Sequence, residues 1–285
     1  MSHNHSALQI PFGSIANRSG TPGWLMSGAV LLSQADDDTG DFEPVFFFIA
    51  IALALGAGYR YYRSLITVHR LVCPRRLRAF LAIWPIVCVG PIIWVLMNLS
   101  DPQYVRGHAD YMLAFAGTGL AWILTTPIIL SLSGISLRDD VIERRNGAAL
   151  IAIASMMLGQ ALCYAGANIG SGATIWTTIV PALLASAVLY LGWFLAAALV
   201  DSVGTVSIDR HIPSAWVLAV LTVLAAADLG WAASGDWNGW PGMLVDFALR
   251  SLPAVVLWLG ASLTLAWMRP RVDLPGRSSN STLHR

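Results

Sequence analysis

The sequence predicts an all-α membrane protein with seven transmembrane helices, an outer N-terminus and a cytoplasmic C-terminus. Of its 285 residues, 56% are hydrophobic and 12% are charged, about half the charged fraction of a soluble domain. Seven apolar stretches reach the roughly 20 residues that cross a bilayer. Most arginines lie in alternate connections. This composition excludes a soluble enzyme, and the net charge of +1 gives no reason to expect a nucleic-acid partner.

Residues 1–42 precede the first predicted span and form an N-terminal segment on the outer side. The stretch 18–35 resembles a secretory signal, because Arg18 precedes an apolar run that is too short to span the membrane. Ser33-Gln34-Ala35 follows as a small-residue cleavage site. The alternative is an uncleaved amphipathic or extended segment at the outer membrane surface.

One helical domain is predicted over residues 43–268, because the connections between the apolar stretches are short. The polar tail 269–285 is predicted to be disordered. No internal repeat is evident in the sequence. The predicted spans are 43–62, 78–99, 111–133, 147–168, 173–200, 213–233 and 243–267.

The arginines set the predicted orientation. Fourteen of the 17 lie in the first, third and fifth connections or in the C-terminal tail. Only Arg18 and Arg106 lie in the N-terminal region or the even-numbered connections. Because arginine is enriched in cytoplasmic loops, the C-terminus is predicted to be cytoplasmic, in a cell membrane of the bacterial inner-membrane type.

The three cysteines form neither a disulfide framework nor a metal site in the sequence pattern. Cys88 and Cys163 lie in apolar runs and are predicted to be small core residues. Cys73 lies among arginines beside a span, as an ordinary loop cysteine or as an acylation site. All six histidines lie in loops or tails, so no intramembrane haem or other metal centre is predicted.

Three ionisable residues lie well inside the predicted spans: Asp228, Asp246 and Arg250. Such residues are costly in a bilayer and are therefore candidates for function. Asp246 and Arg250 are four positions apart, which places them on one helical face and predicts an ion pair. Asp228 is the expected second acidic neighbour. The alternative is a structural staple between the sixth and seventh helices.

The third span contains a polar motif that ends in a proline: Trp122-Ile123-Leu124-Thr125-Thr126-Pro127. Pro127 lacks a backbone donor and is expected to kink the helix. The two threonine hydroxyls are expected to satisfy backbone carbonyls beside the kink.

These motifs, in the third and seventh of seven spans, resemble the microbial (type 1) rhodopsins, and the resemblance covers roughly 43–268. That family has Asp, three residues and the retinal-binding lysine in its seventh helix, where this chain has Asp246 and Arg250. The resemblance implies a rhodopsin-like bundle with a retinal pocket. Its lining in this sequence is Trp122, Thr125, Thr126, Pro127, Met157, Leu224, Ala227 and Trp231.

Other positions depart from the family. The chain has no lysine, and the guanidinium of Arg250 does not condense with an aldehyde, so covalent retinal is excluded. The positions of the pump's arginine, proton acceptor and proton donor are Thr118, Ala121 and Leu132. Light-driven proton pumping is therefore not expected.

The predicted function is non-enzymatic: interaction or signalling in the lipid bilayer, as a partner of a rhodopsin or as a homo-oligomer. Asp228, Asp246 and Arg250 would act as a fixed substitute for the Schiff base and its counterion. The alternative is a photoreceptor-like protein that binds retinal or a carotenoid non-covalently. Catalysis and transport are disfavoured, because the sequence has no nucleophile, metal or phosphate-loop signature.

Overall fold

A computed structural model describes residues 43–67, 73–102, 105–170, 176–235 and 240–268. The chain divides into two compact units, Met1–Glu43 and Pro44–Arg285, and the helices discussed here belong to the second unit. The signal-like stretch 18–35 and the tail 269–285 lie outside the described residues.

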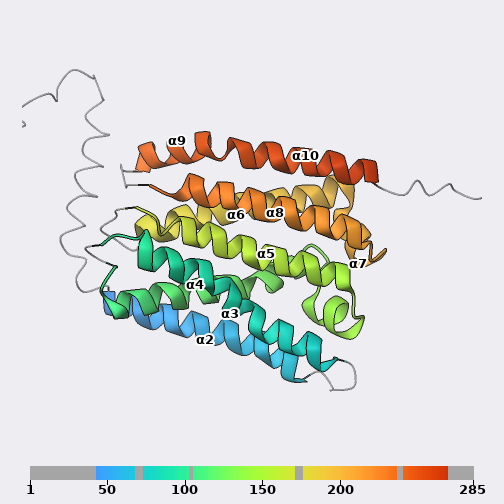
Figure 1. The fold of residues 1–285 in the computed structure, drawn as a ribbon, viewed down its shortest axis with the longest axis horizontal. Coiled ribbons are helices and arrows are strands. Elements are labelled where there is room, and N and C mark those ends of the chain that lie inside the picture. Colours follow the sequence, from blue (N-terminus) through green and yellow to red (C-terminus); the bar gives the residue numbers. More distant parts are fainter. Residues whose placement is uncertain (1–42, 68–72, 103–104, 171–175, 236–239, 269–285) are drawn as a thin grey trace, which may run out of the picture. The chain divides into compact units, whose positions relative to one another are not determined.

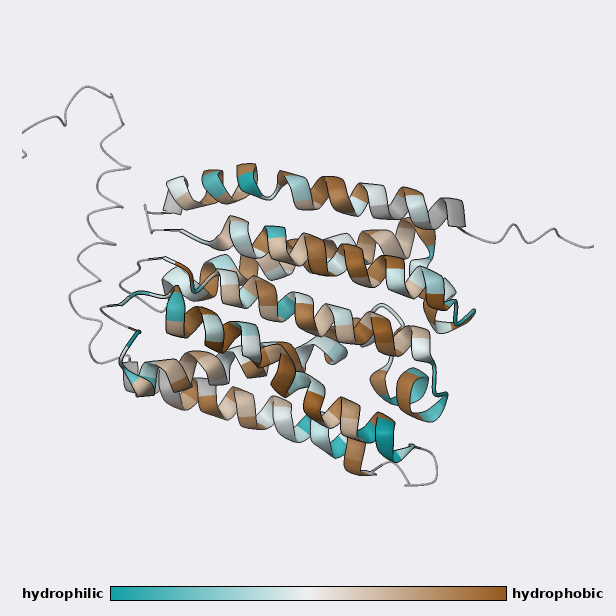
Figure 2. Cartoon of the chain, in the orientation of Figure 1, coloured by the Kyte–Doolittle hydropathy of each residue, from teal (hydrophilic) through white to brown (hydrophobic). Residues whose placement is uncertain are grey.

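Every regular element in the described ranges is a helix (Figure 1). The helices lie side by side, with α9 and α10 at one edge and α2 at the other. Apolar residues run along most of their length (Figure 2). The elements are α2 (Glu43–Thr67), α3 (Arg75–Asn98), α4 (Ala109–Ser131), η2 (Leu137–Glu143), α5 (Gly147–Gly166), α6 (Trp176–Val200), α7 (Ser202–Ser207), α8 (Ile212–Ala233), α9 (Trp240–Arg250) and α10 (Leu252–Met268).

Six described segments are long and apolar enough to cross a membrane, and they correspond to the second to seventh predicted spans. The last of them, Gly242–Gly260, runs across the break between α9 and α10. Helix α2 covers the first predicted span with 25 residues but is not among these six.

The packing centres on α5, which contacts α3, α4, α6 and α8. Its contact with α8 is the most extensive between any two described elements. Small residues allow this approach: the backbones of Gly166 and Gly230 touch, and a Cβ on Gly230 would lie 2.6 Å from the Leu162 carbonyl oxygen. In a bilayer, where lipid is as apolar as leucine, such close van der Waals contact is a main source of helix association.

The turns around α5 and α8 recur at a spacing of 65 residues, a structural repeat that is not evident in the sequence. Arg145 and Arg210 are 65 positions apart, and both have a left-handed backbone, with φ of 53° and 54°. Gly170 and Gly235 have the same separation, and their φ values are also positive, at 118° and 132°. The repeat therefore includes the turns at both ends of α5 and α8.

The turns before α5 and α8 also share their hydrogen bonds. Asn146, which begins α5, donates its backbone N–H to the Asp140 carbonyl at 2.9 Å. His211, which begins α8, donates to the Thr205 carbonyl at 3.1 Å, again 65 positions later. Each residue also caps its helix through a side-chain acceptor.

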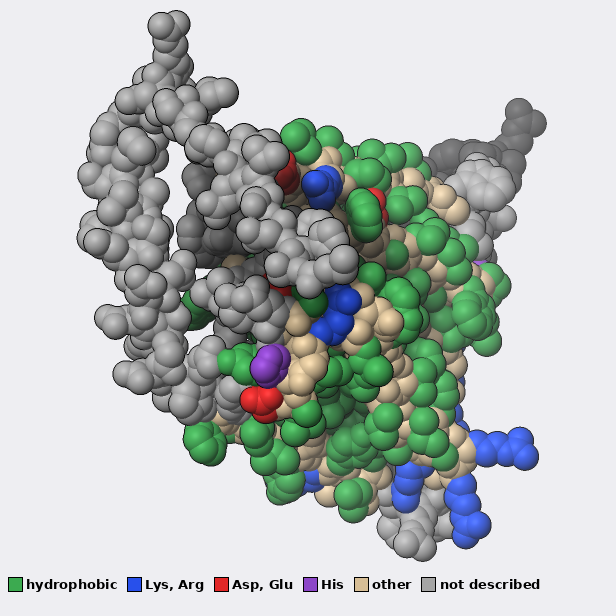
Figure 3. All heavy atoms as spheres, turned by 60° about the vertical axis from the view of Figure 1, so that its left-hand side comes forward, with side chains coloured by type: hydrophobic (Ala, Val, Ile, Leu, Met, Phe, Trp, Pro, Cys, Tyr) green, Lys and Arg blue, Asp and Glu red, His purple; other side chains and the backbone are tan. Residues whose placement is uncertain are grey.

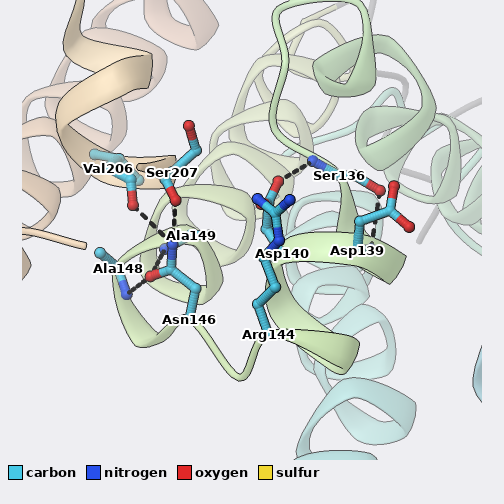
Figure 4. A network of polar contacts seen from close by, with 9 residues as sticks. All are labelled: Ser136, Asp139, Asp140, Arg144, Asn146, Ala148, Ala149, Val206 and Ser207. Atoms are coloured by element: carbon cyan, nitrogen blue, oxygen red, sulfur yellow. Dashed lines mark hydrogen bonds and ion pairs between the residues drawn. The ribbon is translucent and has the colours of Figure 1, made fainter. Parts of the chain in front are cut away.

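One side chain joins the two repeats directly. Asn146 Oδ1 accepts from the N–H groups of Ala148 and Ala149, while its Nδ2 donates to the carbonyls of Val206 and Ser207 at 2.9 and 3.1 Å (Figure 4). The residue is 1% exposed. All the hydrogen-bonding capacity of this buried amide is used, which locks the turns before α5 and α8 together.

The two repeats contact each other through non-equivalent faces, one on α5 and a different one on α8. A Cβ on Gly159 of α5 would lie 3.2 Å from Ala226 of α8. The repeat equivalents of Gly159 and Gly166 in α8 are Leu224 and Trp231, which are 50% and 66% exposed. Thus α8 presents outward the face that α5 buries.

Candidate functional site

The main polar network inside the bundle joins α4, α5 and α6. The indole Nε1 of Trp122 on α4 donates to Ser186 Oγ at 2.9 Å and to Gln160 Oε1 at 3.2 Å. Gln160 is fully buried, and Ser186 is 4% exposed. The three side chains are uncharged, so they are suited to hydrogen bonding rather than to proton transfer.

Only the oxygen of the Gln160 side-chain amide has a hydrogen-bond partner among the described residues. Its Nε2 is buried and has no hydrogen-bond partner among the described residues. A buried amide donor without an acceptor costs about 1–3 kcal/mol. An acceptor placed beside it, from a water or a ligand, would recover that free energy. Sequence reasoning missed Gln160 because it searched the spans for ionisable residues; the signal was a lone glutamine in an apolar helix.

Aromatic side chains bound this network on the α4–α5 side. The rings of Trp122 and Tyr164 have centroids 5.7 Å apart and are tilted by 44°. Tyr164 donates its hydroxyl to the Phe115 carbonyl at 3.0 Å, which ties α5 to α4. The Trp122 side chain is therefore held by its hydrogen bonds to Gln160 and Ser186 and by its ring contact with Tyr164.

Five of the eight predicted pocket residues lie on α4 and α5, the helices that carry Trp122 and Gln160. Thr126, Pro127 and Met157 are buried, and the Thr125 hydroxyl donates to the Trp122 carbonyl at 2.7 Å. The bond agrees with the role expected of Thr125 beside Pro127, whereas the buried Thr126 hydroxyl makes no such bond to a carbonyl.

The three predicted pocket residues on α8 lie elsewhere. Leu224, Ala227 and Trp231 are exposed, in contrast to the buried residues of α4 and α5. Helix α8 contacts α5 through another face, which includes Ala226 and Gly230, and this rotation turns the three side chains outward. The structure therefore does not bring the eight residues together in one pocket.

The predicted charge cluster is also separated. The ion pairs found in the described ranges are Arg138–Glu143 and Arg144–Asp140. The expected pair between Asp246 and Arg250 is not formed, and both residues are exposed. Arg250 instead donates Nη1 to the Ser234 carbonyl at 3.3 Å. The long side chain of Arg250 reaches the end of α8, where the Ser234 carbonyl is its partner in place of the Asp246 carboxylate.

Asp228 has a different partner. Its Oδ2 accepts the backbone N–H of Ala254 at 2.9 Å. This bond lies at the break between α9 and α10, where Pro253 lacks a backbone donor and interrupts the regular helix. Asp228 therefore joins α8 to the break in the seventh span and makes no contact with Arg250.

The positions matched to a proton pump have ordinary structural environments. Thr118 is buried and donates to the Ala114 carbonyl at 2.9 Å. Ala121 is buried at 6% exposure, whereas Leu132, just past the end of α4, is 80% exposed. These three side chains provide no path for a proton.

The surroundings of the three cysteines and of Gly192 on α6 show their structural roles. Cys88 and Cys163 are fully buried, which confirms them as core residues. Cys73 is 3% exposed, a poor position for acylation. At Gly192 of α6, a Cβ would lie 2.5 Å from the indole nitrogen of Trp258, so this glycine is a close-packing position.

The fold and the site define a multi-pass helical membrane protein that contacts lipid. No family model, no curated protein and no solved structure matches the chain. Among the residues that the structure describes, no three His, Cys, Asp or Glu side chains are grouped so that they could hold a metal ion.

Proposed function

We propose that this seven-span membrane protein acts by binding and interaction, and that it holds a small uncharged ligand at the side-chain amide of Gln160. The observation that carries the proposal is the fully buried Nε2 without a partner among the described residues. The ligand would offer a hydrogen-bond acceptor, such as a carbonyl or hydroxyl oxygen. Trp122, itself bonded to Ser186, orients the amide, and neither side chain supplies an acid or base, so we propose no enzymatic reaction.

The proposed topology has α2 as the first span, the N-terminus outside and the C-terminus in the cytoplasm of a bacterial-type cell. The arginines support it: Arg63 and Arg75 flank the α2–α3 connection, and Arg138 and Arg210 lie near the starts of α5 and α8. All four are at the end of the bundle where α2 ends and α3 begins, and positive residues favour the cytoplasmic side.

The test of the ligand compares Gln160→Met with wild type. Native mass spectrometry of protein purified in mild detergent should show a bound small molecule on wild type that Gln160→Met lacks. Thr222→Val is the matched control, because it removes a buried hydroxyl of α8 that bonds only the Leu218 carbonyl. A wild-type protein without added mass, together with a Gln160→Met variant that melts at the same or a higher temperature, would contradict the proposal.

The second candidate function follows the rhodopsin resemblance: non-covalent binding of retinal or a carotenoid. It is favoured by the burial of Thr126 and Met157 and by the bond of Thr125 to the Trp122 carbonyl, and is weakened by the exposure of Trp231. Adding all-trans-retinal and recording the visible spectrum before and after hydroxylamine tests it. A shifted band that hydroxylamine leaves intact supports non-covalent binding, whereas a spectrum identical to free retinal in detergent rejects it.

The interaction role as a homo-oligomer or as a partner of a rhodopsin is part of the proposal. Trp193, on the fifth predicted span, is not a contact for such a partner, because it is 1% exposed and donates to Ser133 Oγ. Cross-linking in native membranes, followed by mass spectrometry of the linked proteins, tests for a second copy or another membrane protein.

A further inference from the structure

The region with the most unbalanced charge is the α2–α3 hairpin. Between Glu43 and Asp101 the sequence has six arginines and no acidic residue. The described ones lie at the joined ends of the two helices: Arg60, Arg63, Arg75, Arg76 and Arg78. In Figure 3, side chains coloured as Lys or Arg project at one edge of the molecule, beside a surface that is largely hydrophobic.

Two hydrogen bonds hold this end of the hairpin together. The hydroxyls of Tyr61 and Tyr62 on α2 donate to the carbonyls of Leu81 and Ala82 on α3, at 2.8 and 3.1 Å. Tyr61 is 4% exposed, so the contact is part of the packed interior. The arginines therefore belong to two helices whose relative position is held by these bonds.

The arginines of the hairpin differ from those beside η2. Arg138 pairs with Glu143 at 3.0 Å, and Arg144 pairs with Asp140 at 3.2 Å. Arg60, Arg75 and Arg76 are exposed, and no ion pair of the described residues includes them. Within the described residues no acidic side chain neutralises them, so they are free to take an anion from outside the chain.

We propose that Arg60, Arg63, Arg75 and Arg76, named here the hairpin arginines, bind the phosphate of an anionic phospholipid. A guanidinium fork matches two phosphate oxygens, and basic groups at a membrane surface attract anionic headgroups. Lipid is favoured over soluble phosphate because exposed apolar side chains adjoin the arginines on α2. Ile66 is 77% exposed, which gives acyl chains a surface next to the phosphate site.

The test uses native mass spectrometry of the full-length protein with equal amounts of dioleoyl-phosphatidylglycerol and dioleoyl-phosphatidylcholine. Wild type should retain the anionic lipid preferentially. The double variant Arg75→Gln/Arg76→Gln should bind it roughly 30-fold more weakly, since each basic residue near an anionic surface contributes about 1 kcal/mol. Arg75→Lys/Arg76→Lys keeps the charge but loses the fork, and should fall between the two.

The control variant Arg106→Gln/Arg138→Gln removes two arginines elsewhere and should retain the wild-type preference. An equal loss in this control would show that only net charge matters and would overturn the site. Displacement of the lipid by millimolar inorganic phosphate would show a soluble-anion site and would also overturn the lipid assignment. A wild-type protein without preference for the anionic lipid would reject the proposal outright. Thermal melting of each variant in detergent verifies that it is folded.

Discussion

Helices α5 and α8 occupy equivalent places in the two repeats but have opposite surroundings. Almost every residue of α5 is buried, whereas α8 has an exposed face. The difference is one of side-chain size: Gly159 and Gly166 are replaced in the second repeat by Leu224 and Trp231. The same turn geometry thus starts both helices, but only the glycine face admits another helix at close distance.

The comparison shows how the stacking of repeats ends. If each helix were followed by another in the same way, the assembly would be open-ended. Here α8 is followed by α10, which contacts it extensively and donates the Ala254 N–H to Asp228. Leu224 and Trp231 remain exposed, so the part of α8 that carries them is suited to lipid.

The largest effect is expected from Gly166→Leu. The new side chain would meet the backbone of Gly230, which cannot move as a flexible side chain can. We expect a loss of about 3–5 kcal/mol in the free energy of unfolding, above the usual range for overpacking because the obstacle is backbone. Trp231→Leu at the equivalent position should change it by less than about 0.5 kcal/mol. Unfolding in detergent by increasing SDS measures both, and equal effects would contradict the comparison.

The next effect concerns the two cap residues. Asn146→Ala removes two acceptor bonds at the start of α5 and two donor bonds to the turn before α8. We expect it to cost about 2–4 kcal/mol, because buried partners lose their bonds as well. His211→Ala removes one cap bond, to the Ser214 N–H, and should cost about 1 kcal/mol. A smaller effect at Asn146 than at His211 would show that the bridge between the repeats is not important.

A smaller effect is expected at Asp228, whose position has Cys163 as its repeat equivalent. Asp228→Ala leaves the Ala254 N–H without its acceptor and should cost about 1–2 kcal/mol. Asp228→Asn retains an amide oxygen as acceptor and should cost less. Thermal melting of the two variants distinguishes a need for an acceptor from a need for charge: equal losses would indicate charge.

The smallest effect is expected at Asp246, for which the sequence predicts a tight pair with Arg250. Since the structure shows an exposed carboxylate without this pair, Asp246→Asn should change the free energy of unfolding by no more than about 0.5 kcal/mol. A marked loss of stability would instead support the ion pair with Arg250 that the sequence predicts.

The sequence predicted six of the spanning segments well, because length and hydropathy determine which segments enter a bilayer. It did not predict which face of each helix turns inward. Lipid is as apolar as the protein interior, so Leu224 and Trp231 carry no pattern that separates an outer surface from a pocket. The repeat was missed because its clearest signs are backbone angles at Arg145 and Arg210.

The prediction of a charge cluster failed for a related reason. Helical spacing fixes the face of Asp246 and Arg250 but not the reach of a long side chain, and Arg250 extends to the carbonyl of Ser234. The third-span motif was more informative. A proline lacks a backbone N–H wherever it lies, and Thr125 bonds a carbonyl within the same helix, so neither effect depends on which face turns inward.

The contact of Gly166 with Gly230 also bears on how the chain is made. Helix α5 leaves the ribosome well before its main partner α8, and completing the intervening residues takes roughly 3–15 s at about 5–20 residues per second. During that interval the glycine face of α5 lacks the cover that α8 later provides. A membrane insertase or chaperone that shields newly inserted helices would therefore have to cover this face of α5 until α8 is inserted.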